Sequence, residues 1–269
     1  MPLSVFGLTT LWPPEVAVIL SVVAAVYLIA VGPGSPNRWG PPATARQTLY
    51  FMTGLVLAWV GFGTPIHLIG EVYLLSAHMI TTMVTTMLAP PLLILGTPAG
   101  VFDRLPCNRF VQPAFRMLTK PLVAFGLFNG LFLIWHSPQL FDAALKNDLV
   151  HLLQYATLFF GSFVGWWPLL SPLPALPRLP DALQMFYTFG SLVVQTLLFG
   201  PIMILDYPIY ESYKHVPRLI QGLSVLEDQQ AAHLFMGVLA PLVLGSVFTA
   251  AFFRLFGEDG RKSNRTSAG

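Results

Sequence analysis

Six histidines and a run of methionines are the residues of this 269-residue chain best suited to chemistry. His78 opens the apolar stretch HMITTMVTTMLAPP, in which Met79, Met83 and Met87 follow one another at four-residue spacing. Residues four apart share one face of a helix. Imidazole binds copper, zinc, iron and nickel, and a thioether prefers Cu(I). The pattern therefore indicates a soft-metal site, with core packing as the alternative role of the methionines.

The composition predicts an integral membrane protein. Hydrophobic residues make up 55% of the chain and charged residues only 10%, whereas a soluble domain carries about 25% charged residues. The segments apolar over roughly the 20 residues needed to cross the hydrocarbon core are 14–32, 44–64, 70–95, 120–137, 147–170, 182–206 and 227–256. We predict an all-α bundle of seven transmembrane helices over residues 1–256, followed by a polar, disordered tail at 257–269.

The distribution of basic residues predicts the orientation of this bundle. Eleven of the 14 Lys and Arg residues fall on one side of the predicted spans and three on the other. The positive-inside rule then places the N-terminus outside and the C-terminus in the cytoplasm. The first basic residue is Arg38, so the start of the chain lacks the positive region of a signal peptide, and we expect the first span to be retained.

Charge and cysteine content exclude several classes of function. The net charge of +2 is spread over many loops, which predicts no nucleic-acid partner. The single cysteine, Cys107, excludes an intramolecular disulfide and a CxxC metal or redox motif. The chain has no GxSxG, no HExxH and no glycine-rich phosphate loop. We therefore predict that the protein is not an enzyme. Its predicted spans place it in contact with the lipid bilayer.

In the predicted topology all six histidines fall in or near the outer half of the bundle. Four of them lie on helices or at helix ends, where a bundle could bring them together, and ionisable groups buried in membranes are usually functional. Glu71 lies seven residues before His78, and Asp228 lies five residues before His233, so a carboxylate could orient an imidazole. The candidate metal ligands are His78, His136, His151, Asp228, His233, Met79 and Met83.

Four stretches carry a family resemblance: HMITTMVTTMLAPPLLILGTP (78–98), IWHSPQLFDAALKN (134–147), HLLQYATLFFGSFVGWWPLL (151–170) and LEDQQAAHLFMGV (226–238). They resemble the CtaG family of membrane proteins, which is linked to assembly of the caa(3)-type cytochrome c oxidase. The resemblance implies a protein of the bacterial plasma membrane that helps to deliver or insert copper into a haem-copper oxidase at the outer face. Oxidase subunits and a copper-donating protein are the implied partners. The motif positions carried over are His78, His136, His151 and Asp228.

The chain also departs from the family pattern. Thr82 stands where the family shows a second histidine one turn after His78, and Tyr155 stands one turn after His151. Paired histidines at this spacing clamp a metal on one helical face. Two functions follow from the comparison. One is a copper-delivering oxidase assembly factor, and the other is a metal-free scaffold or accessory subunit of a respiratory oxidase complex.

Two further functions stay open on the residues alone. An ion-coupled transporter usually needs charged groups inside its spans, and the predicted span interiors are nearly free of them. A haem b protein needs two histidines at matched depth, which His78 and His233 could supply. The spacings Gly126-x3-Gly130 and Gly161-x3-Gly165 would let helices pack closely, as a scaffold requires.

Pro90 and Pro91 predict a kink or a helix end near the inner end of the third span. A proline inside a helix removes a backbone donor and collides with the carbonyl four residues earlier. The hydroxyls of Thr85 and Thr86 are expected to adjust the local hydrogen bonding, as threonines do near prolines in lipid-buried helices.

Overall fold

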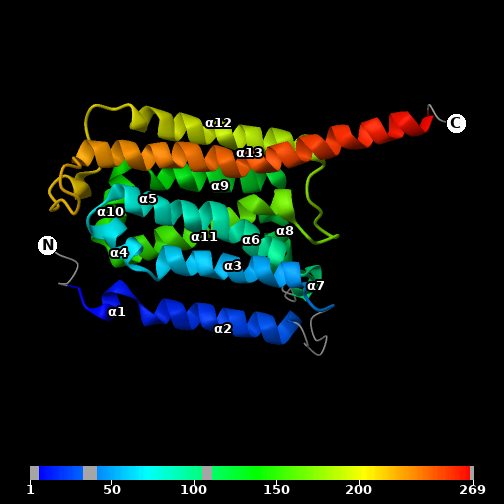
Figure 1. Cartoon of the computed structure of the whole chain (residues 1–269), viewed down its shortest axis with the longest axis horizontal. Helices are drawn as coiled ribbons and strands as arrows, with labels where there is room; N and C mark the ends of the chain where they lie inside the picture. Colours follow the sequence, from blue (N-terminus) through cyan, green and yellow to red (C-terminus); the bar gives the residue numbers. More distant parts are fainter. Residues whose placement is uncertain (1–5, 33–40, 105–110, 267–269) are drawn as a thin grey trace.

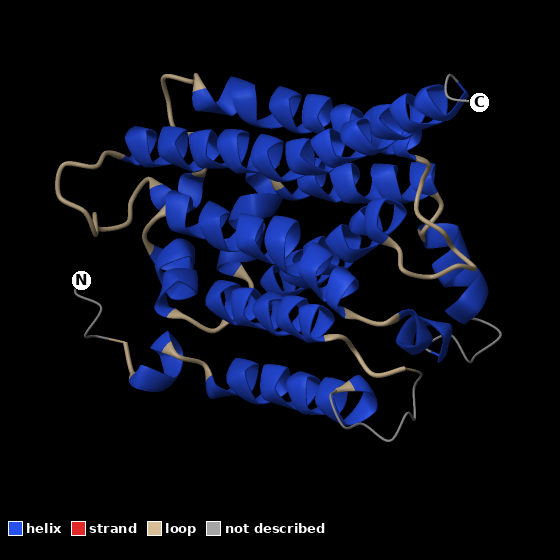
Figure 2. Cartoon of the chain, turned by 45° about the vertical axis from the view of Figure 1, so that its right-hand side comes forward, coloured by secondary structure: helices blue, strands red, loops and turns tan. Residues whose placement is uncertain are grey.

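The computed structural model describes residues 6–32, 41–104 and 111–266, and every regular element in this part of the chain is a helix (Figure 2). The helices long and apolar enough to cross a membrane are Pro14–Val31, Ala45–Val72, Leu75–Gly96, Asp148–Leu170, Asp181–Met203 and Val225–Gly257. A bent pair, Gln112–Leu118 and Pro121–Trp135, meets at 73° and gives a seventh span if it is counted as one. The predicted all-helical membrane fold is confirmed, with six or seven spans.

The helices form a bundle with two distinct edges. Helix α2 (Pro14–Val31) lies at one edge, and the paired helices α12 (Asp181–Met203) and α13 (Val225–Thr266) lie at the other (Figure 1). The inner helices are α3 (Ala45–Phe62), α5 (Leu75–Met83), α9 (Pro121–Trp135) and α11 (Asp148–Leu170). The short helix α1 (Leu8–Leu11) and the end of α13 lie at opposite ends of the bundle (Figure 1).

Helix α13 extends through most of the polar tail. It continues to Thr266, within the segment 257–269 for which the sequence predicts disorder, and the last three residues lie outside the described part of the chain. Extending an existing helix fixes one residue per hydrogen bond and avoids the cost of nucleation. Disorder of this tail stays a prediction.

The second span ends in α4 (Pro65–Val72), and the chain turns at Tyr73. The third span then begins with α5 and changes its winding. A π-helical turn, η2 (Val84–Leu88), follows, and α6 (Ala89–Gly96) then continues to the far end. The sequence predicts a kink or a helix end near Pro90 and Pro91. The structure instead has this π-helical turn just before the two prolines.

Hydrogen bonds around the π-helical turn explain why the helix survives the prolines. The Thr85 hydroxyl donates to the Thr81 carbonyl at 2.8 Å, and the Thr86 hydroxyl donates to the Thr82 carbonyl at 2.6 Å. The Thr86 carbonyl lies four residues before Pro90 and accepts the indole N–H of Trp166 at 3.0 Å. A side chain of α11 thus replaces the backbone donor that the proline lacks, and the threonines act as predicted.

Only one of the two glycine spacings serves helix contact within the described structure. A methyl group on Gly161 would lie 2.4 Å from Leu131, and one on Gly165 would lie 2.7 Å from Phe128, so α11 approaches α9 closely at these glycines. A methyl group on either glycine of the α9 spacing, 126 and 130, would have nothing within 4 Å. The methionine run has a packing role, because its three side chains are fully buried in the main hydrophobic core.

Candidate metal centre

Two helix starts place three potential ligands together at the end of the bundle that carries α4. Helix α4 begins at Pro65, a favoured first residue, so His67 and Glu71 stand four apart on one face. Helix α11 begins after Asn147, whose side chain accepts the backbone N–H groups of two following residues. This cap fixes the first turn of α11, which carries His151.

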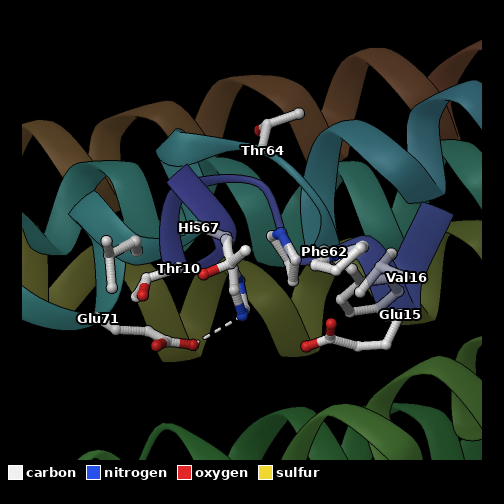
Figure 3. Close-up of a pocket in the computed structure, with 11 residues that line it drawn as sticks. Thr10, Glu15, Val16, Phe62, Thr64, His67 and Glu71 are labelled. Atoms are coloured by element: carbon white, nitrogen blue, oxygen red, sulfur yellow. Dashed lines mark ion pairs between the residues drawn. The ribbon is translucent and has the colours of Figure 1, made fainter. Parts of the chain in front are cut away.

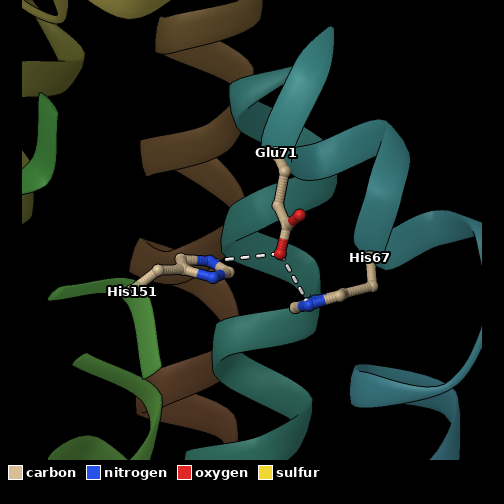
Figure 4. Close-up of side chains that lie close together, drawn as sticks. All are labelled: His67, Glu71 and His151. Atoms are coloured by element: carbon tan, nitrogen blue, oxygen red, sulfur yellow. Dashed lines mark ion pairs between the residues drawn. The ribbon is translucent and has the colours of Figure 1, made fainter. Parts of the chain in front are cut away.

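The three side chains converge on one carboxylate oxygen (Figure 4). His67 Nε2 lies 2.7 Å from Glu71 Oε1, and His151 Nε2 lies 3.1 Å from the same oxygen. Among the His, Cys, Asp and Glu side chains that the structure describes, this triad of His67, Glu71 and His151 is the group whose ligand atoms all lie within 4.8 Å of one another. Two imidazoles and a carboxylate form a donor set that suits copper or zinc and leaves room for a further ligand.

A pocket leads to the triad. It has a volume of about 570 Å³ and lies between α4 and the segment that joins α1 to α2. Glu71 and Glu15 lie on opposite sides of it, with Thr10 and His67 between them (Figure 3). The triad side chains are 19–25% exposed, so the site is neither sealed nor fully open. A carboxylate on each side of the pocket favours the entry of a cation.

An aromatic group lies directly behind the triad. The Tyr155 ring lies 4.7 Å from the His151 ring and 5.1 Å from the His67 ring, measured between centroids. It also lies 5.9 Å from the His78 ring, which in turn lies 4.8 Å from Phe141. Tyr155 therefore contacts the rings of both triad histidines and of His78.

The structure distributes the seven predicted ligands over several places. His151 belongs to the triad, and His78 lies one aromatic layer behind it. His136 and His233 lie elsewhere, beside Phe199. Met79 and Met83, the two predicted sulfur ligands, are fully buried in the core. The residues that sequence reasoning did not name as ligands are His67 and Glu71.

Asp228 caps a helix. Its Oδ2 accepts the Leu75 backbone N–H at 2.8 Å, and its Oδ1 accepts the Ser76 backbone N–H at 3.1 Å and the Ser76 hydroxyl at 2.5 Å. These donors lie in the first turn of α5, where the positive end of the helix dipole favours an anion. The carboxylate therefore ties α13 to α5, the helix that carries His78.

Replacing Asp228 with alanine is expected to destabilise the protein by about 2 kcal/mol or more. The change leaves buried N–H groups of α5 without acceptors, and each unpaired donor costs about 1–3 kcal/mol. Thermal unfolding in detergent measures the effect. Glu227→Ala is the matched control, because the Glu227 carboxylate is exposed and accepts the Ser224 N–H at the start of its own helix. Equal melting temperatures for the two variants would contradict this role of Asp228.

A local signal for the missed ligands was present in the sequence. His67 and Glu71 have the four-residue spacing of neighbours on a helix. The predicted spans 44–64 and 70–95 leave His67 in the loop between them. The structure instead forms the short helix α4 there. A proline at the first helical position is the signal that identifies this helix.

Comparison with known proteins places the chain in a family. The family model of the cytochrome c oxidase caa3 assembly factor (Caa3_CtaG) matches residues 25–258. The chain belongs to this family. The match runs from within α2 into α13 and includes the whole triad, so the CtaG resemblance predicted from sequence is confirmed. Comparison with curated proteins and with solved structures gave no match.

Proposed function

We propose that this CtaG-family protein is a non-enzymatic assembly factor that holds copper at His67, Glu71 and His151 and passes it to a haem-copper oxidase. The observation that carries the proposal is the shared carboxylate oxygen, 2.7 Å and 3.1 Å from two imidazole nitrogens, beside an accessible pocket. A donor protein must release its metal, and a three-residue site with an open position suits transfer better than a closed four-ligand site.

The orientation that we propose follows from charge. The end of the bundle with the triad carries Lys146, Lys214 and Arg218, whereas most of the other basic residues belong to segments at the opposite end. The positive-inside rule then places the triad at the outer face of a bacterial plasma membrane. A copper-donating protein and the oxidase subunits would both meet the protein there.

The proposal is tested by copper binding to the purified protein in detergent. We expect the triple variant His67→Gln, Glu71→Gln, His151→Gln to bind one fewer Cu(I) per chain than the unsubstituted protein, in competition with a chromophoric chelator. His215→Gln is the matched control, because His215 lies at the same end but is 85% exposed and contacts only Glu211. Equal copper stoichiometry in the triple variant and the unsubstituted protein would overturn the proposal.

A metal-free scaffold is the second candidate, and the replaced histidines favour it. Thr82 and Tyr155 are both buried where the family pattern predicts metal ligands. A strain that depends on this chain for its oxidase separates the two functions. Copper delivery predicts that the triple variant lowers oxidase copper and oxidase activity although the protein reaches the membrane. A scaffold predicts that activity and co-purification with oxidase subunits are unchanged.

A further inference from the structure

A second pair of histidines lies away from the triad, and hydrogen bonds fix the tautomer of both. His136 directly follows α9, and its Nδ1 lies 2.7 Å from the Phe132 carbonyl. His233 lies in α13, and its Nδ1 lies 2.8 Å from the Gln229 carbonyl. A carbonyl only accepts hydrogen bonds, so both Nδ1 atoms carry a hydrogen. In the neutral rings the free lone pair is therefore on Nε2.

Both lone pairs are buried without a partner. His136 is 4% exposed and His233 is fully buried. Within the part of the chain that the structure describes, neither Nε2 atom has a hydrogen-bond partner. A buried acceptor left unpaired costs free energy, and native proteins contain few of them. One ligand bound to both Nε2 atoms would remove this cost.

Shared neighbours place the two imidazoles in one compartment. The Phe199 ring lies 5.5 Å from the His136 ring and 6.4 Å from the His233 ring. The Tyr210 ring stacks on His233 with an interplanar angle of 8°, and its hydroxyl donates to the His136 carbonyl at 3.1 Å. His136 also lines a pocket of about 710 Å³ between α9, α10 (Pro138–Lys146) and α12.

We propose that His136 and His233 form a second metal site that binds one Cu(I) through their Nε2 atoms. Imidazole is a suitable copper ligand, and a backbone carbonyl on the other ring nitrogen is the usual orienting partner of a metal-binding histidine. The aromatic surroundings favour a monovalent ion, because the free energy needed to bury an ion rises steeply with the number of charges it carries. Zinc would bring two charges and normally takes four ligands. The site shares no residue with the triad and does not depend on the proposed function.

The test uses the triple variant of the triad as its background. We expect this chain to retain one Cu(I), and the further change His233→Leu to remove it or to weaken its binding at least tenfold. His233→Met in the same background should retain Cu(I), because a thioether also binds this ion. His215→Leu is the control for loss of an unrelated histidine and should leave Cu(I) binding unchanged.

The outcomes separate this site from the triad. If the unsubstituted protein binds one Cu(I) and the triple variant binds none, the second site is wrong and the triad proposal stands. If the unsubstituted protein and the triple variant each bind one Cu(I), and His233→Leu removes it, the second site stands and the triad proposal fails. Retention of Cu(I) after His233→Leu would also overturn the second site.

A measurement on the unsubstituted chain guards against a variant that fails to fold. Protein with ¹⁵N-labelled histidine is titrated with Ag(I), a redox-inert substitute for Cu(I), and the imidazole resonances are followed by NMR. The Nε2 signals of His136 and His233 should shift together as one further equivalent binds. If the only signals that shift are those of the triad histidines, no second site exists.

Discussion

Replacing Gly70 with alanine is expected to separate α4 from α5 and to destroy the triad. A methyl group at this position would lie 2.6 Å from the His78 backbone nitrogen and 2.7 Å from its Cα. Both are backbone atoms, so no side chain can rotate away, and α4 itself must move. Because Glu71 is the next residue, its carboxylate would leave His151, whose position depends on α11.

The movement of α4 would also break a hydrogen bond that restrains this helix. The Tyr213 hydroxyl donates to the Gly70 carbonyl, and burial raises the pKa of the Tyr213 phenol, which keeps the hydrogen on the oxygen. Overpacking alone costs about 1–3 kcal/mol. We therefore expect the Tm in detergent to fall by roughly 5 °C and the copper bound at the triad to be lost.

Gly130→Ala is the matched control for Gly70→Ala. Gly130 also lies in a helix, but an added methyl group there would meet nothing within 4 Å. Alanine favours the helix more than glycine does, so the Tm should stay the same or rise slightly. A Gly70→Ala protein with the Tm and copper content of Gly130→Ala would show that the close approach of α4 to α5 does not hold the triad.

The spans were predictable because the bilayer imposes a simple rule. Backbone polar groups in lipid must be satisfied within the segment, so a long apolar run becomes a helix. The predicted segment 147–170 accordingly agrees with α11 to within one residue, and 182–206 begins within one residue of α12. The segment 120–137 was harder, because its helix has only 15 residues and bends sharply from the one before it.

The site was less predictable because it depends on contacts between distant residues. His67 and His151 are 84 positions apart (151 − 67), and both lie against Glu71. Asp228 has the composition of a ligand, but the N–H groups of α5, more than 150 positions earlier, occupy both its oxygens. Residue type indicated metal chemistry, whereas the orientation of each helix about its own axis decided which carboxylate faces the histidines. A single sequence carries no direct signal of that rotation.

Replacing Glu71 with glutamine is expected to weaken Cu(I) binding at the triad by about tenfold or more, a loss of the size seen when metal-site partners are removed. The side chain keeps its shape but loses the negative charge that faces both His67 and His151. Chelator competition in the detergent-purified protein measures the change. Protons and copper compete for the same lone pairs, so binding to the unsubstituted triad should also weaken as pH falls through the range in which imidazole titrates.

Glu211→Gln is a close control for Glu71→Gln, because Glu211 also pairs with a histidine four residues away. Its Oε1 lies 3.3 Å from His215 Nε2, but the pair is exposed and has no second imidazole. A hydrogen bond from Lys214 holds the pKa of Glu211 below its usual range, so this glutamate also loses a negative charge at neutral pH when it is replaced. If Glu211→Gln weakens copper binding as much as Glu71→Gln does, surface charge attracts the ion and the triad does not bind it. If only Glu71→Gln has the effect, the convergence of two imidazoles on one partly buried carboxylate oxygen is what binds copper.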